Sequence, residues 1–204
     1  RPLIDWTLDK LTAAGVTRVV VNIHHIADAL EDHLSRRSAP QILISDERDQ
    51  LMDTGGGLAK ARSLLGEAPI IVANIDALWI DGARLEIDRL AAGFDAKTMD
   101  FRLMLSPMDR NLGFPGAGDF FLQDDGRLSR RGDRPRAPYA FAGVQVMRPQ
   151  VLDGVRAEPF STNRLWDEAL KTGRLFGAAM DAFWMHVGDP EARDAAENRL
   201  KLKS

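Results

Sequence analysis

Apolar residues follow two alternating patterns along the first part of the chain. One pattern repeats with the period of a helix, and the other is a continuous apolar run that is typical of a buried strand. The helical pattern covers 3–14, which ends at Gly15, and then 27–37 and 58–65. The apolar runs cover 17–23, 41–45 and 69–73. Strands that alternate with helices in this way predict parallel strands with right-handed crossovers, in an open α/β sheet.

The second part of the chain has shorter strands and more turn residues. Asp124-Asp125-Gly126 separates short strands at 119–122 and 127–130, and Asp-Gly between strands is a hairpin signal. Asp189 is predicted to cap a last helix that has Pro190 in its first turn. The other expected elements are helices at 84–92 and 163–171 and strands at 101–105, 139–147, 174–180 and 183–187. These elements predict one domain over 1–204, with an antiparallel part inserted in a mixed sheet.

Composition narrows the classes of function. The chain has 204 residues, which is enough for one domain with a core. A formal net charge of -3 argues against broad binding of nucleic acid or of membrane surfaces. The sequence contains no cysteine, which excludes disulfides and thiolate zinc sites. No apolar run is long enough to span a membrane, so we expect a cytoplasmic enzyme or binding domain.

Thr54-Gly55-Gly56-Gly57 stands directly before the helix predicted at 58–65. Glycine permits close approach of a ligand to the backbone, and the first turn of a helix has free amides that favour an anion. The segment is therefore a candidate for nucleotide binding. A loop with a helix cap, for which Thr54 is a good residue, explains the same spacing equally well.

Asn74-Ile75-Asp76 follows the buried strand at 69–73. Open α/β sheets bind ligands at the carboxyl edge of their strands. A carboxylate at that edge suits a hard cation such as Mg²⁺, held between the protein and a phosphate group. Asp76 is therefore the strongest candidate for a metal ligand, and the alternative is a turn or cap for the next segment. His24 and His25 follow another strand, either as pocket residues at the same edge or as a polar strand end.

Several further positions are candidates, each with a structural alternative. His186 precedes a glycine turn and suits a metal ligand, a base or a hydrogen-bonded core residue. Gly143 interrupts a strand, which often marks a bulge or a ligand against the backbone. Arg130 and Arg131 suit a phosphate contact, or they form a solvated charged face. Asn163 is either a ligand contact or the polar start of a helix.

Taken in order, these segments resemble the motifs of sugar-1-phosphate nucleotidylyltransferases. The matching segments are Arg1-Pro2-Leu3-Ile4, 51–58, Asn74-Ile75-Asp76, Phe141-Ala142-Gly143-Val144 and 184–191. Among the subfamilies, the short length and Thr-Gly-Gly-Gly are most similar to N-acetylmuramate-1-phosphate uridylyltransferase, followed by mannose-1-phosphate guanylyltransferase. The resemblance implies a Rossmann-like, GT-A-like nucleotidyltransferase fold. This is an α/β fold with a mixed, mainly parallel sheet flanked by helices and a small antiparallel sugar-binding part.

The resemblance also implies a reaction and its partners. A sugar-1-phosphate would attack the α-phosphorus of a nucleoside triphosphate, which gives an NDP-sugar for cell-wall synthesis and releases pyrophosphate. The best pair would be UTP with N-acetylmuramate 1-phosphate, and the next would be GTP with mannose 1-phosphate. The protein would act as a monomer or homodimer, without nucleic acid or membrane partners.

The same resemblance implies a role for each candidate residue. Asp76 would be catalytic by holding Mg²⁺, with His186 at the second metal position. Gly55 and Gly56 would contact the base, Gly143 the sugar and Arg131 the sugar phosphate. The implied substrate-binding residues are Thr54, Gly55, Gly56, Asn74, Gly143, Arg131 and Asn163.

Three departures from the family pattern affect this interpretation. The sequence begins after the family's N-terminal strand and glycine-rich loop, so we expect the natural chain to begin earlier. His186 replaces an aspartate, and neutral imidazole is a poorer Mg²⁺ ligand than a carboxylate. Asp189 replaces a threonine. Two rival functions are a binding relative without catalysis and a nucleotide-sugar glycosyltransferase, which would need an Asp-x-Asp pair that Asp76-Ala77-Leu78 lacks.

Overall fold

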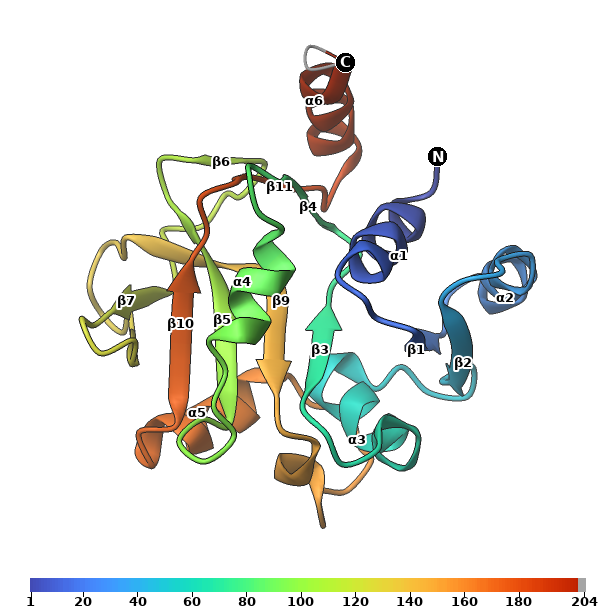
Figure 1. Ribbon diagram of the computed structural model, residues 1–204, viewed down its shortest axis with the longest axis horizontal. Coiled ribbons are helices and arrows are strands. Elements are labelled where there is room, and N and C mark those ends of the chain that lie inside the picture. The colour runs from blue at the N-terminus through green and yellow to red at the C-terminus, as the bar shows by residue number, and fades with distance from the viewer. Residues whose placement is uncertain (202–204) are drawn as a thin grey trace.

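The computed structural model describes residues 1–201 and shows an α/β fold of mixed sheets flanked by helices (Figure 1). The helices are α1 (Leu3–Ala13), α2 (Ala27–Ser35), α3 (Asp53–Leu65), α4 (Glu86–Ala92), the 3-10 helix η1 (Pro149–Leu152), α5 (Asn163–Lys171) and α6 (Pro190–Lys201). The strands are β1 (Arg18–Ile23), β2 (Gln41–Asp46), β3 (Ile70–Ala73), β4 (Ala77–Ile80), β5 (Phe101–Pro107), β6 (Asn111–Leu112), β7 (Phe120–Leu122), β8 (Leu128–Arg130), β9 (Tyr139–Met147), β10 (Leu175–Ala179) and β11 (Phe183–His186). The predicted fold class is confirmed.

The main sheet has six strands and centres on β9. Its order is β10-β5-β9-β7-β8, and β3 also pairs with β9. Only β10 and β5 run parallel in this sheet, because β9 is antiparallel to β3, β5 and β7, and β7 is antiparallel to β8. The share of parallel pairs is therefore smaller than the helix–strand alternation predicts. Alternation along the chain does not show that β9, from the second half, becomes the partner of β3.

The first two strands form a sheet of their own. β1 pairs with β2 in parallel, from Arg18 opposite Gln41 to Ile23 opposite Asp46. β1 does not pair with β3, and Figure 1 shows the two strands apart. A groove of about 440 Å³ separates them, lined mostly by apolar side chains of α1, β1, α3 and β3. The single open sheet expected from the first half is thus divided at this groove.

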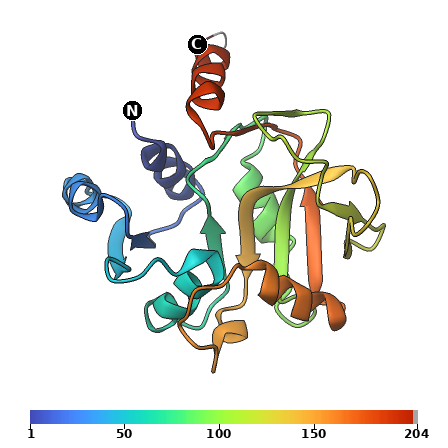
Figure 2. The same ribbon diagram turned by 180° about the vertical axis from the view of Figure 1, so that it is seen from behind.

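Alternate residues of the main sheet face two separate layers. Met104 packs with Ile87 and Leu90 of α4 on one face. Leu103 and Leu105 face the other layer, which contains α5 and η1. This division follows from the two-residue period of a strand. Figure 2 shows α5 and η1 from behind, on the side opposite α4.

A third sheet of three strands joins distant segments in the order β4-β11-β6. β4 and β6 are absent from the expected elements, and β6 has only two residues, which are too few to show a period. Within residues 1–201, no helix combines the length and apolar character that a membrane span requires.

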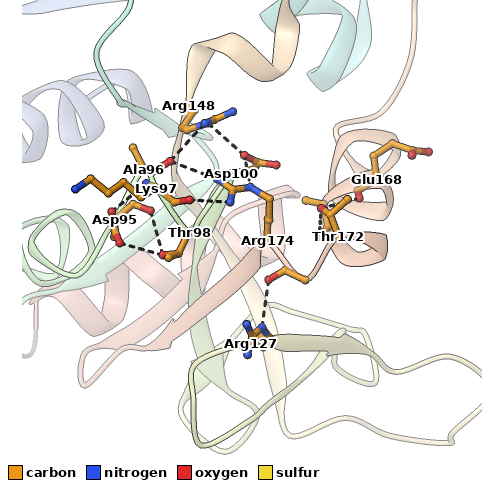
Figure 3. Close-up of polar contacts among 12 residues, drawn as sticks. Asp95, Ala96, Lys97, Thr98, Asp100, Arg127, Arg148, Glu168, Thr172 and Arg174 are labelled. Carbon is orange, nitrogen blue, oxygen red and sulfur yellow. Dashed lines mark hydrogen bonds and ion pairs between the residues drawn. The ribbon is translucent and has the colours of Figure 1, made fainter.

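An arginine cluster stabilises the end of the main sheet where β5 and β10 begin (Figure 3). Arg174 Nε donates to Asp100 Oδ1 at 2.9 Å, and its Nη1 donates to the carbonyl of Lys97 at 2.9 Å. Arg148 lies 3.2 Å from the same Asp100 oxygen. Asp100 precedes β5, and Ile70 and Phe101 both pair with Met147, so this is the end of the sheet where β3 begins. The carboxyl end of β3 lies at the opposite end.

Candidate functional site

A cavity of about 920 Å³ opens at the carboxyl end of β3, beside β9, α3 and α5. This volume is within the range of small-molecule sites. Most of the residues predicted from the sequence line it, namely Thr54, Asn74, Asp76, Gly143, Asn163 and His186. Gly55, Gly56 and Arg131 do not belong to its lining. His24 lines a different, smaller hollow with Arg48.

Asp76 and His186 are brought together by the pairing of β4 with β11. His186 is the register partner of Ala77, the residue after Asp76. The amide of Val187 donates to the carbonyl oxygen of Asp76 at 2.7 Å. Two segments far apart in the sequence therefore place a carboxylate and an imidazole on the same part of the cavity wall.

The imidazole of His186 is set between aromatic rings. Its centroid lies 6.2 Å from that of Phe114 and 5.8 Å from that of Trp184. Its Nδ1 is buried and has no hydrogen-bond partner in the part of the chain that the structure describes. A buried nitrogen without a partner is uncommon, because desolvation is costly unless a ligand supplies the missing contact. His186 is therefore suited to a ligand contact rather than to a satisfied core position.

Gly143 lets the strand β9 approach the turn that carries Asp76. Its φ is +80°, and a Cβ there would lie 2.6 Å from the Cβ of Ala77 and 3.5 Å from that of Asn74. The carbonyl oxygen of Gly143 accepts a hydrogen bond from the Asn74 amide at 2.8 Å. The strand β9 runs through Gly143 without a break, but its register with β5 shifts between Leu103 and Leu105, so the glycine lies at a bulge.

The glycine triplet lies inside α3 rather than before it. The amides of Gly55 and Gly56 donate to the carbonyl of Phe160 at 2.9 and 3.0 Å, so they are not free to face a base. A Cβ on Gly56 would lie 2.1 Å from the carbonyl oxygen of Glu158. The glycines therefore serve close packing of α3 against 158–160. Thr54 does line the cavity, and its Oγ1 accepts a hydrogen bond from the amide of Thr162 at 2.9 Å.

Glu47 and Asn22 form a polar pair in the cavity wall that the sequence did not single out. Glu47 is only 4% exposed, and its Oε1 accepts a hydrogen bond from Asn22 Nδ2 at 2.5 Å. Asn22 Nδ2 also donates to the carbonyl of Gly57 at 3.2 Å. A Cβ on Gly57 would lie 2.8 Å from Glu47 Oε1. Glu47 lies in the polar segment 46–53, which shows no helix or strand pattern, so only its tertiary contacts reveal its burial.

The opposite wall of the cavity is aromatic and polar. Trp166 Nε1 donates to Gln145 Oε1 at 2.8 Å, and the rings of Phe141 and Trp166 meet at 4.8 Å. Asn163 lies on this wall. Arg131, expected near the sugar phosphate, donates to the carbonyls of Gly118 and Arg134 instead. Its neighbour Arg130 lines the cavity.

Comparison with known proteins shows the family. No protein-family model matches the chain. N-acetylmuramate alpha-1-phosphate uridylyltransferase from Caulobacter vibrioides is 45% identical over 204 residues, which cover 98% of this chain and 84% of that protein. The chain belongs to the sugar-1-phosphate nucleotidylyltransferases. The protein of the same name from Neisseria meningitidis serogroup B is 29% identical over 192 residues, covering 92% of this nucleotidylyltransferase and 80% of the relative.

Solved structures support the same fold. UDP-glucose pyrophosphorylase from Acinetobacter baumanii superposes with a TM-score of 0.74, covering 96% of this nucleotidylyltransferase and 81% of that chain. At 13% sequence identity, this likeness concerns the fold alone. The predicted family and GT-A-like fold are confirmed.

The nucleotidylyltransferase cavity offers few groups that suit a metal ion. Residues 1–201 contain no cluster of three or more His, Cys, Asp or Glu side chains arranged to hold one. Mg²⁺ commonly uses one or two carboxylates and completes its shell with water and substrate phosphates. Asp76 and the unpartnered Nδ1 of His186 fit this sparse arrangement. Asp189, by contrast, caps α6 as predicted, because its Oδ1 accepts a hydrogen bond from the Ala192 amide at 2.8 Å.

Proposed function

We propose that this nucleotidylyltransferase makes UDP-N-acetylmuramate and pyrophosphate from UTP and N-acetylmuramate 1-phosphate. The 45% identical relative over 98% of the chain supports this pair of substrates. The observation that carries the proposal is that Asp76 and His186, from paired segments, both line the same 920 Å³ cavity. A product of this kind belongs to cell-wall synthesis.

The reaction is a displacement at the α-phosphorus of UTP. A phosphate oxygen of the sugar phosphate forms a bond to that phosphorus, the bond to the β-phosphate oxygen breaks, and pyrophosphate leaves with the electron pair. Asp76 and His186 would hold Mg²⁺, which neutralises phosphate charge when bound. No proton acceptor is needed when the attacking oxygen is already ionised.

The remaining cavity residues would position the two substrates. Thr54 and the Asn22–Glu47 pair line the side next to α3 and suit polar contacts with a base or ribose. Asn163, Phe141 and Gln145 line the side next to β9 and α5 and suit a sugar. Holding the reacting groups in line in this way accounts for much of the catalysis of phosphoryl transfer.

The test is pyrophosphate release from a panel of sugar 1-phosphates, each offered with UTP and with GTP in the presence of Mg²⁺. We expect the highest kcat/KM for N-acetylmuramate 1-phosphate with UTP. Preference for mannose 1-phosphate with GTP would instead support the second pair of substrates. UTP binding by calorimetry without turnover of any sugar phosphate would support a binding relative without catalysis.

A further inference from the structure

The charged side chains around the cavity are distributed unevenly. Four carboxylates line it, those of Glu47, Asp53, Asp76 and Asp119. Arg130 is the one lysine or arginine that lines it within residues 1–201. The carboxylates therefore repel an anionic substituent of a substrate over most of the cavity wall. Arg130 is the one positive group of the described lining, and it would attract such a substituent. Guanidinium stays charged at every physiological pH and donates charge-assisted hydrogen bonds to carboxylates.

Arg130 is held in place by its neighbours on the sugar side of the cavity. Its guanidinium carbon lies 5.0 Å from the ring centroid of Phe120 and 5.7 Å from that of Trp166. Nη1 donates to Asn163 Oδ1 at 2.7 Å. A guanidinium fixed against two aromatic rings has lost much of its rotamer freedom before a ligand arrives, which favours binding.

The acidic partner of Arg130 leaves room for a second carboxylate. Nε and Nη2 both donate to the same oxygen, Oδ1 of Asp167, at 3.1 and 2.7 Å. The Asp167 side chain is 56% exposed and stands outside the cavity lining, so water screens its charge. A guanidinium has five N–H donors, and one N–H of Nη1 has no acceptor in the described part of the chain.

N-acetylmuramate differs from N-acetylglucosamine by a lactyl ether that carries a carboxylate. We propose that Arg130 selects N-acetylmuramate 1-phosphate by binding this carboxylate, an inference that rests on the proposed function. Arg130 is then a specificity-determining residue. It contacts the substituent that distinguishes the two sugars.

The test compares N-acetylmuramate 1-phosphate with N-acetylglucosamine 1-phosphate, which has the same sugar phosphate without the lactyl group. With UTP and Mg²⁺, Arg130→Gln should lower kcat/KM for the muramate about 10- to 100-fold. The same substitution should change kcat/KM for the glucosamine less than about threefold. Arg130→Lys keeps the charge but loses the planar guanidinium that Phe120, Trp166 and Asn163 hold in place, and it should give an intermediate loss, again for the muramate alone.

Arg134→Gln is the matched control. Arg134 follows the same hairpin and its guanidinium carbon lies 4.4 Å from the Phe121 ring, but it does not line the cavity. We expect it to leave the ratio of the two kcat/KM values unchanged. Thermal melting of each variant separates loss of folding from loss of selectivity, and Arg130→Lys serves as the test if Arg130→Gln does not fold.

Two other outcomes would overturn the inference. Equal losses with both sugars would show that Arg130 acts on the shared phosphate or on the fold. An unchanged ratio in both Arg130 variants would show that the carboxylate is read elsewhere. A wild-type chain that does not use N-acetylmuramate 1-phosphate at all would instead overturn the proposed function together with this role, so the two failures are distinguishable.

Discussion

The carbonyl oxygen of Asp76 accepts a hydrogen bond from the amide of Val187, at 2.7 Å, and so joins the turn after β3 to the end of β11. His186, next to Val187, is the partner of Ala77 in the same pairing. The positions of the carboxylate and the imidazole are thus coupled through backbone contacts. A change on either strand should affect both groups.

Replacing Asp76 by Asn should abolish most of the turnover. The amide keeps the size of the side chain but removes the charge that would hold Mg²⁺, so we expect kcat to fall about 100- to 1000-fold. Stability should change by less than about 0.5 kcal/mol, because the backbone contact with Val187 remains. Pyrophosphate release and urea denaturation measure the two effects.

Asp49→Asn is the control for loss of one carboxylate, since Asp49 is exposed and outside the cavity lining. Turnover near the wild-type value in Asp76→Asn would refute the metal assignment.

Replacing His186 by Asp should strengthen Mg²⁺ binding. A second carboxylate beside Asp76 is a harder and more strongly charged ligand than neutral imidazole. We expect the Mg²⁺ concentration for half-maximal rate to fall about tenfold. The melting temperature should also rise more steeply with Mg²⁺ than it does in the wild type, which gives a readout independent of turnover. An unchanged Mg²⁺ dependence in both measurements would mean that residue 186 does not contact the metal.

Replacing Gly143 by Ala should be more damaging than the same change at Gly154. Both glycines have positive φ, +80° and +75°, so both alanines are strained by about 1–2 kcal/mol. A Cβ at Gly154 meets nothing within 4 Å, whereas at Gly143 it would lie 2.6 Å from the Cβ of Ala77. We expect Gly143→Ala to cost about 1–3 kcal/mol more in free energy of unfolding and to lower kcat, because Ala77 adjoins Asp76. Equal costs in chemical denaturation would show that the close approach is unimportant.

Asp81 should make folding sensitive to acid. Burial alone would raise its pKa, but hydrogen bonds from the Glu86 amide, Lys10 and Trp79, together with the charge of Lys10, lower the pKa below the ordinary value of 3.8. A lowered folded-state pKa stabilises the protein above the unfolded pKa. This stabilisation is lost as the pH falls through the folded pKa.

The variant Asp81→Asn tests this pH dependence. It should be about 1–3 kcal/mol less stable at neutral pH, because Lys10 loses a partner at 2.5 Å in a pair whose side chains are only 18% and 16% exposed. Below about pH 4 the difference from wild type should shrink. Urea denaturation between pH 3 and pH 7 measures it, with Asp88→Asn as a control on an exposed residue. A constant difference across this range would contradict the assignment.

Much of the fold follows from local pattern. The apolar runs at 17–23 and 69–73 correspond to β1 and β3, and the Asp-Gly turn joins β7 to β8. Asp189 caps α6 as its sequence context indicates. These features need only nearby residues, because strand periodicity, turn chemistry and helix capping are set within a few positions.

Site residues are predictable from the sequence where they directly follow a helix or strand with a recognisable apolar pattern. Asp76 is predictable because it follows the apolar run of β3, and the structure places it in the cavity. The strand β3 itself is only partly buried, not buried as its apolar run predicts, because its face toward β1 lines the open groove. The free amides expected at Gly55 and Gly56 are absent, because a distant carbonyl of Phe160 occupies them. The sequence around Glu47 does not indicate that this side chain is buried, because exposed and buried polar segments have the same composition.

The sequence by itself determined the element types, the family resemblance and the carboxylate at the end of β3. Only the tertiary structure decided which strands pair, that β9 separates β3 from β5, and that Arg130 rather than Arg131 reaches the cavity. The physical reason is that pairing and burial depend on segments distant in the chain. Arg130 is the last residue of β8 and faces the cavity, whereas Arg131 follows the strand and donates to the carbonyls of Gly118 and Arg134, although the two residues are adjacent and identical in chemistry.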